Sequence, residues 1–222
     1  VPSLVMSTLA KLLSSLPGAA ITSVKINGVV HEFSTIPGVV EDVPELIVNL
    51  KNVRLKVFDN DEKIIRIDFK GAGEIKAADI VTDGTVEILN PDLLICTLER
   101  GCDFEMEIII GRGRGYVPAT RNKKEDDPIG LIAIDSIFTP VQKANYRVEK
   151  TRVGQSIDFD KLIMEVETNG TLTAKDVLSL SAKIIDEHIM MFVGLVDGMS
   201  SLNILKDDEK TGIIITDLAQ KP

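Results

Sequence analysis

Few side chains in this sequence could act as nucleophile, base or metal ligand. His31 and His188 lie far apart in the chain, and neither has a second possible metal ligand at helical or zinc-finger spacing. Cys96 and Cys102 do not have zinc-binding spacing, and two cysteines are too few for a disulfide framework. We therefore interpret all four as structural or surface residues of a protein that belongs in the reducing cytoplasm.

Motifs for nucleotides and ions are equally sparse. The sequence contains no Walker loop and no nucleophile elbow, and Gly71-Ala-Gly73 is only half of a dinucleotide fingerprint. Acidic clusters at Asp59–Glu62, Glu125–Asp127 and Asp158–Asp160 lack the pattern of a calcium loop. We expect no catalytic residue, no cofactor and no metal site. The alternative is an unrecognised enzyme that combines His31 with acids of the 158–167 region.

The most unusual run is GRGRGYVP at Gly111–Pro118, which directly follows a strong strand pattern. Glycines at this spacing are typical of a bulged strand where backbone or side chains come close. A protein interface is a second interpretation. A third is a nucleic-acid-binding module, in which Arg112 and Arg114 bind phosphate and Tyr116 stacks on a base. The net charge of −9 argues against the third interpretation.

Apolar periodicity indicates an α+β protein with a helix at each end and strands between. The nearly apolar stretch Leu4–Leu16 predicts a first helix, and Asn27-Gly28 predicts a hairpin between Ala20–Ile26 and Val29–Phe33. A second helix should begin near Val39, with Glu41 and Asp42 in its first turn. Alternation then predicts half-buried strands at 53–57, 65–69, 104–110, 131–135, 144–153 and 159–167.

The last predicted helix carries a broad apolar stripe. Thr173 is its expected N-cap, and the stripe consists of Val177, Leu180, Ile184, Ile185, Ile189 and Phe192. Together with the apolar first helix, the stripe favours an interface made by helices. No apolar run approaches the roughly 20 residues that a membrane-spanning helix needs, so we expect no membrane contact.

Six segments, in order, resemble the bacterial-type RNA polymerase α-subunit family over about residues 12–195. They are LLSSLPGAAITSVKINGVVHEFSTIPGVVEDVPELIVNLK (Leu12–Lys51), AADIVTDGTVEI (Ala77–Ile88), GRGRGYVPA (Gly111–Ala119), PIGLIAIDSIFTPVQKANYRVE (Pro128–Glu149), RVGQSIDFDKLIMEVETNGT (Arg152–Thr171) and the helix 174–192. The resemblance implies a non-catalytic assembly scaffold of DNA-directed RNA polymerase, which is a nucleotidyltransferase complex active in transcription.

The resemblance also implies the domain organisation. A discontinuous dimerisation domain, formed by residues 1–17 and 145–196, packs helices on an antiparallel sheet. An inserted, mostly β domain covers residues 18–144. Residues 197–222 are expected to form a linker toward a C-terminal domain that is absent here, so that DNA is met only indirectly through the complex.

The resemblance further implies which residues contact which partner. A homodimer interface is expected at Leu9, Leu12, Leu13, Val177, Leu180, Ile184, Ile185, His188 and Phe192. Contact with the β subunit is expected at Lys11, His31, Glu32, Phe33, Ser34, Gly38, Glu41, Asp42, Arg112 and Arg114. Contact with the β′ subunit is expected at Arg147, Glu149 and Arg152.

The start of the chain departs from the family pattern. Where the family has TLGNALRR in its first helix, this chain has SLVMSTLAK at Ser3–Lys11. The paired arginines of the family are reduced to Lys11, which predicts a weaker contact between this helix and the β subunit.

Overall fold

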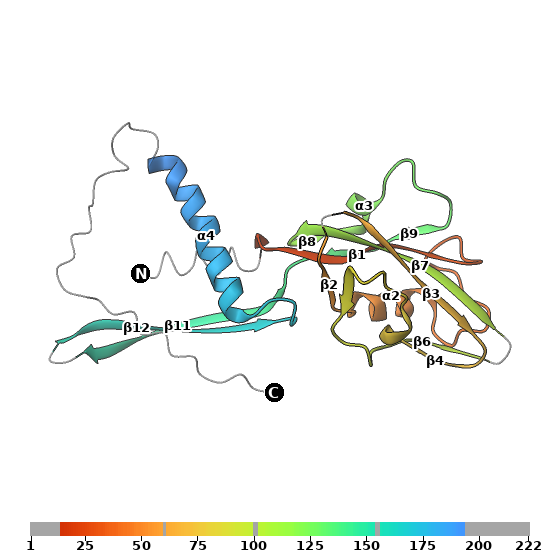
Figure 1. Ribbon diagram of the computed structural model, residues 1–222, viewed down its shortest axis with the longest axis horizontal. Coiled ribbons are helices and arrows are strands. Elements are labelled where there is room, and N and C mark those ends of the chain that lie inside the picture. The colour runs from red at the N-terminus through yellow and green to blue at the C-terminus, as the bar shows by residue number, and fades with distance from the viewer. Residues whose placement is uncertain (1–13, 60, 100–101, 154–155, 194–222) are drawn as a thin grey trace. The chain divides into compact units, whose positions relative to one another are not determined.

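The computed structural model describes residues 14–59, 61–99, 102–153 and 156–193 (Figure 1). The chain divides into two compact units, Val1–Ile185 and Asp186–Pro222. Every element below lies in the first unit, except the end of the last helix. Most of the predicted first helix, including Leu9, Lys11, Leu12 and Leu13, and the predicted linker 197–222 fall outside the described residues.

A four-stranded antiparallel sheet carries the larger core. Its order is β3-β7-β1-β9, formed by Lys63–Lys70, Asp103–Arg114, Pro17–Ile26 and Leu131–Ala133. The alternation that predicted β7 places Phe104, Met106, Ile108 and Ile110 on its buried face. Thr22 is the extra residue where β1 shifts register against β7, and the bulge keeps the strand paired on both sides.

Helix α2 (Val43–Lys51) covers this core with Val43, Leu46 and Leu50. The Asp42 side chain accepts a hydrogen bond from the Glu45 backbone N–H at 2.9 Å and is the N-cap of the helix. The expectation that Glu41 and Asp42 belong to the first turn was therefore wrong. Asp42 precedes that turn because an N-cap keeps an extended backbone, and Pro44 is accepted at the helix start.

Short elements complete the same core. They are three two-stranded ribbons, β2–β5 (Leu55–Val57 with Val86–Ile88), β4–β6 (Gly73–Lys76 with Leu94–Leu98) and β8–β10 (Tyr116–Val117 with Ser136–Ile137), together with the 3₁₀ helix η1 (Ala77–Asp79) and helix α3 (Ala119–Asn122). One cluster of buried residues, from Ile21 to Ile134, includes members of β2, β4, β5, β6 and η1. Residues far apart in the sequence therefore share one apolar interior.

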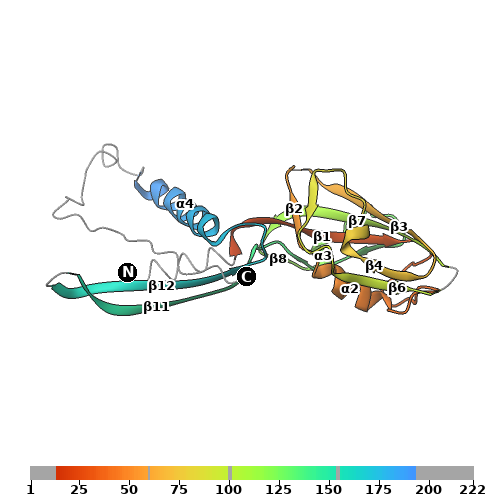
Figure 2. The same cartoon turned by 60° about the horizontal axis from the view of Figure 1, so that its bottom comes forward.

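A long hairpin and the last helix form a second, much smaller core. Strands β11 (Val141–Val153) and β12 (Ser156–Thr168) run side by side (Figure 2), and α4 (Ala174–Val193) follows them. Its fully buried residues are Leu16, Val141 and Val177. Thr173 caps α4 as predicted, because its Oγ1 accepts from the Asp176 backbone N–H at 3.2 Å.

The sequence-based hairpin at Asn27-Gly28 was wrong. Val29–Phe33 forms no strand, and β1 pairs instead with β7 and β9. The Asn27 backbone N–H donates to Glu105 O at 3.0 Å, so the turn is held by β7 rather than by a returning strand. The α+β fold class is confirmed, while the predicted division into a discontinuous and an inserted domain stays a prediction.

Candidate subunit interfaces

A turn after β1 exposes two large apolar side chains. The Ser34 backbone N–H donates to His31 O at 3.1 Å, and Ser34 Oγ lies 3.1 Å from His31 Nδ1, so the turn is closed locally. Val30 is 63% exposed and Phe33 is 81% exposed. An exposed aromatic side chain on a closed turn is suited to enter a pocket on a partner protein. We call Val30–Ser34 the apolar turn.

The neighbouring residues Gly38, Glu41 and Asp42 have roles inside the fold. The Glu41 carboxylate accepts from Thr97 N at 2.6 Å and from Thr97 Oγ1 at 2.9 Å, which fastens this segment to β6. Gly38 has φ +76°, and Cys102 Sγ fills the space where a Cβ would lie. These roles escaped the sequence analysis, because Glu41 and Thr97 are far apart in the chain. Their predicted contact with the β subunit stays a prediction.

At the end of β7, the glycines and the arginines lie on opposite faces of the strand. A Cβ on Gly111 would lie 2.8 Å from Thr22 Cγ2, and one on Gly113 would lie 2.7 Å from the Phe138 ring. The predicted close approach at the glycines is thereby confirmed. Arg112 and Arg114 continue the face of Ile110 beyond the core and are exposed, and Arg112 Nη1 donates to Asp59 O at 3.0 Å.

We expect Gly113→Ala to lower the free energy of unfolding by about 1–3 kcal/mol, the usual cost of overpacking. The Phe138 ring is 4% exposed, so neither it nor the added methyl group can move into solvent. Urea denaturation measures the change. Arg112→Ala, one residue earlier on the exposed face, is the control and should cost less. An unchanged urea midpoint for Gly113→Ala would contradict the close packing.

The structure separates the predicted β-subunit contacts into two patches. Along the β1–β7 ladder, Pro17 pairs with Arg114 and Ile26 pairs with Met106. At about 3.3 Å per residue, Arg114 and the apolar turn lie at opposite ends of a ladder about 30 Å long. The arginine end instead adjoins Ser14, because a Cβ on Gly115 would lie 3.1 Å from Ser14 O.

Asp135 organises the surface beside the arginine end. Its Oδ1 accepts from the Ala119 backbone N–H at 2.7 Å, and its Oδ2 lies 3.3 Å from Lys51 Nζ. The Ala119 N–H is the largest cause that lowers the pKa of Asp135, and Lys51 and Tyr116 add to it. Asp135 thereby interacts with the Tyr116 side chain through a hydrogen bond. Tyr116 and Ile137 are each 61% exposed. No sequence signal identified this residue.

We expect Asp135 to make part of the stability dependent on pH. Because its pKa is lower in the folded chain than the unfolded value near 3.9, its stabilisation is complete above that value. The stabilisation is lost as the pH falls through the folded-state pKa. Asp135→Asn should therefore be less stable than the wild type at pH 7 and should approach it toward about pH 2. Denaturation midpoints across pH 2–7 measure this, and parallel curves would contradict it.

The hairpin presents one charged face and one apolar face. On the charged face Arg147 Nε lies 3.2 Å from Glu149 Oε1, with both side chains largely exposed. The same face has a small hollow of about 120 Å³ lined by Asn145, Tyr146, Arg147, Ile163 and Glu165. Arg152 is exposed further along β11. The opposite face supplies Ala144, Met164 and Val166 to the second core.

Within the described part of the chain, the apolar stripe of α4 is buried at its beginning and exposed toward its end. Val177 is buried, and Ile184 and Ile185 are half-buried. Further along, Ile189 is 49% and Phe192 is 71% exposed. Leu180 and His188 are exposed as well.

Within the described residues, no group of three or more His, Cys, Asp or Glu side chains could hold a metal ion. No described helix is both long and apolar enough to cross a membrane. The geometry that stands out is therefore that of exposed surfaces: the apolar turn, the arginine end, the charged hairpin face and the α4 stripe.

Comparisons with known proteins identify the family. Residues 24–139 match the model of the RNA polymerase Rpb3/RpoA insert domain. The α subunit of DNA-directed RNA polymerase from Desulforudis audaxviator is 56% identical over 201 residues, which is 90% of this chain and 64% of the relative. The corresponding α subunits of Desulfitobacterium hafniense and Desulforamulus reducens are 53% and 52% identical, each over 199 residues, covering 90% of this chain and 63% of the relative.

The chain thus spans less than two thirds of the length of these relatives. Within that span the match runs through the main sheet, the apolar turn and the arginine end described above. The chain belongs to the RNA polymerase α-subunit (Rpb3/RpoA) family.

Proposed function

We propose that this chain is the assembly scaffold of a DNA-directed RNA polymerase. Two copies pair through their helices, and the pair holds the β and β′ subunits, which carry out the chemistry. The chain supplies no catalytic group or cofactor of its own and acts in the cytoplasm. DNA is reached through the assembled complex.

The proposal rests on the exposed apolar residues of α4 and on the small core beside this helix. Among the residues that the structure describes, this core has Leu16, Val141 and Val177 as its fully buried members, which is few for a hairpin and a long helix. The same helix leaves Ile189 and Phe192, the last residues of its apolar stripe, exposed. A second copy that covers this stripe would enlarge the core and remove the exposed apolar surface from water.

The surfaces proposed to bind the β and β′ subunits differ in chemistry. The apolar turn offers Phe33 as an anchor for the β subunit, with Glu32 and His31 at its rim. The hairpin offers the β′ subunit a charged face, where Arg147 and Glu149 set register more than affinity. The remaining predicted contacts belong to the same proposal: Lys11, Ser34, Gly38, Glu41, Asp42, Arg112 and Arg114 for the β subunit, and Arg152 for the β′ subunit.

A nucleic-acid-binding module is less well supported by the described residues. Arg112 already donates to Asp59 O, and the whole chain has a net charge of −9. Phosphate binding depends on a concentration of positive charge that this surface does not provide.

The test is co-expression of this chain with the β and β′ subunits of its own source. We expect light scattering of the isolated chain to give the mass of a dimer. We also expect affinity capture of the chain to recover both large subunits in a ratio of two copies to one of each. A monomer that captures neither subunit would refute the proposal.

A further inference from the structure

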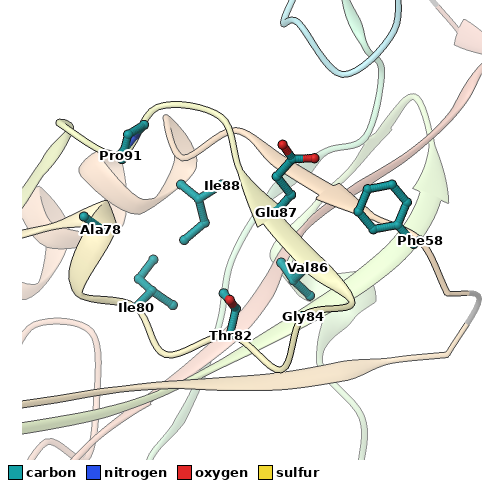
Figure 3. A pocket seen from close by; sticks show the side chains of 9 residues that line it. All are labelled: Phe58, Ala78, Ile80, Thr82, Gly84, Val86, Glu87, Ile88 and Pro91. Carbon is teal, nitrogen blue, oxygen red and sulfur yellow. The ribbon is translucent and has the colours of Figure 1, made fainter.

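A hollow beside β5 lies outside all the surfaces assigned above. It measures about 560 Å³ and is lined by Phe58, Ala78, Ile80, Thr82, Gly84, Val86, Glu87, Ile88 and Pro91. Figure 3 shows Ile80, Thr82 and Ile88 between the two arms of the loop that runs from Ala78 to Pro91. The floor is apolar, since Ile80 and Val86 are almost fully buried, and Phe58 stands exposed at the rim.

One wall of this hollow is a strand edge without a partner. Leu55 pairs with Ile88 and Val57 pairs with Val86, whereas backbone hydrogen bonds at the two ends of this ladder run from Phe58 N–H to Thr85 O and from Leu89 N–H to Arg54 O. In an antiparallel pair, residues at the intervening positions turn their backbone groups away from the neighbouring strand. In the described part of the chain, Val86 and Ile88 find no backbone partner on that side.

The edge is held in an extended shape by a turn at its start. The Asp83 carboxylate accepts from Thr85 N at 3.0 Å and from Thr85 Oγ1 at 2.6 Å. Gly84 supplies the left-handed backbone conformation of this turn, with φ +81°. An edge fixed in this way is prepared to pair with another strand, because no further ordering of its own backbone is required.

The rim of the hollow is acidic. Glu87 is the charged residue of the lining, and exposed Asp79, Asp83 and Asp92 each adjoin a lining residue in the chain. Lys56 pairs with Glu87 across the β2–β5 ladder, and its Nζ lies 5.2 Å from the centroid of the Phe58 ring, so it offsets part of this charge. The four acidic residues outnumber it, which favours a cationic partner over a nucleic acid.

We propose that the β5 edge binds a short extended segment of a partner protein in which β-branched apolar residues alternate with lysine or arginine. The partner strand pairs with Val86 and Ile88, its apolar side chains contact Ile80 and Ile88, and its cations face Glu87 and Asp83. This binding adds a strand to the β2–β5 ribbon and does not depend on the proposed assembly function. A small-molecule site fits less well, because buried polar groups do not converge on this open hollow.

The test uses the full chain and a fluorescein-labelled probe, acetyl-Lys-Val-Lys-Val-Lys-Val-Lys-amide. Fluorescence anisotropy gives its affinity, and amide NMR shifts locate it. We expect saturable binding with the largest shifts at the Val86 and Ile88 amides. A probe with glutamate in place of lysine should bind at least tenfold more weakly. A probe N-methylated at its valines should also bind at least tenfold more weakly, because it lacks the N–H groups that donate hydrogen bonds to the edge of β5.

Glu87→Lys should lower the affinity of the chain for the lysine probe at least tenfold. Glu165→Lys makes the same charge change on exposed β12 and should leave the affinity within twofold. Three outcomes would each overturn the proposal: no saturable binding, equal loss in both variants, or equal binding of the N-methylated probe. Equal loss would mean that only the net charge attracts the probe.

Discussion

Ile189→Asp should convert the proposed dimer of this chain into monomers. Ile189 is 49% exposed in the single chain and lies one turn beyond the half-buried Ile185, about 40° from it around the axis of α4. An aspartate there would take a charge into an apolar interface at a cost of about 2–4 kcal/mol. A twofold interface contains the residue twice, so the dimer should dissociate on the order of a thousandfold more readily. Sedimentation equilibrium measures the dissociation constant.

Met190→Asp is the matched control for this substitution. Met190 is the next residue of α4 and is similarly exposed, at 56%, but it lies off the apolar stripe, about 140° around the helix axis from Ile185. Both variants lose an apolar side chain and gain the same charge. Only the variant at Ile189 should dissociate. Equal dissociation of both would mean that net charge, rather than a defined interface, controls association.

The two cores of the chain differ in size, and this difference predicts which part of a monomer unfolds first. The larger core runs continuously from Ile21 to Ile134 and includes buried residues of every strand of the main sheet. The smaller one depends on Leu16, Val141 and Val177. Local stability follows buried apolar contacts, so a monomer should lose its structure first in β11, β12 and α4. Association and folding of this part of the chain would then be linked.

Local patterns predicted most elements but not how they associate. The alternation of β7 and the stripe of α4 were correctly assigned, because side-chain periodicity follows backbone geometry. Asn27-Gly28 suggested a local hairpin, yet β1 found its partners in β7 and β9, which lie much later in the chain. Turn chemistry fixes the direction of the backbone there, and burial decides which strand is adjacent.

Interactions between distant residues explain the site features that the sequence did not reveal. Glu41 reaches Thr97, and Asp135 reaches both Ala119 and Lys51. Each of these acids occurs in an ordinary polar context in the sequence, so nothing marks it as a partner of a particular backbone N–H. Gly113 was the exception, since closely spaced glycines indicate in the sequence itself that something approaches the strand.

Phe33→Ala should weaken binding of the β subunit about 30-fold or more and leave the dimer intact. Phe33 is 81% exposed, so it contributes little to the stability of the free chain. An aromatic anchor that becomes buried in a partner accounts for about 2 kcal/mol or more of the binding free energy. Surface plasmon resonance with the immobilised dimer and purified β subunit measures the affinity.

Ile64→Ala is the matched control for the apolar turn. Ile64 is 62% exposed on β3, a strand of the main sheet, and its truncation also removes exposed apolar surface, from a position outside the predicted contacts. The β subunit should bind this variant as tightly as the wild type. If Phe33→Ala binds unchanged while the dimer still captures the β subunit, the contact lies elsewhere. The arginine end at Arg112 and Arg114 then becomes the surface to test, because it lies about 30 Å away at the other end of the β1–β7 ladder.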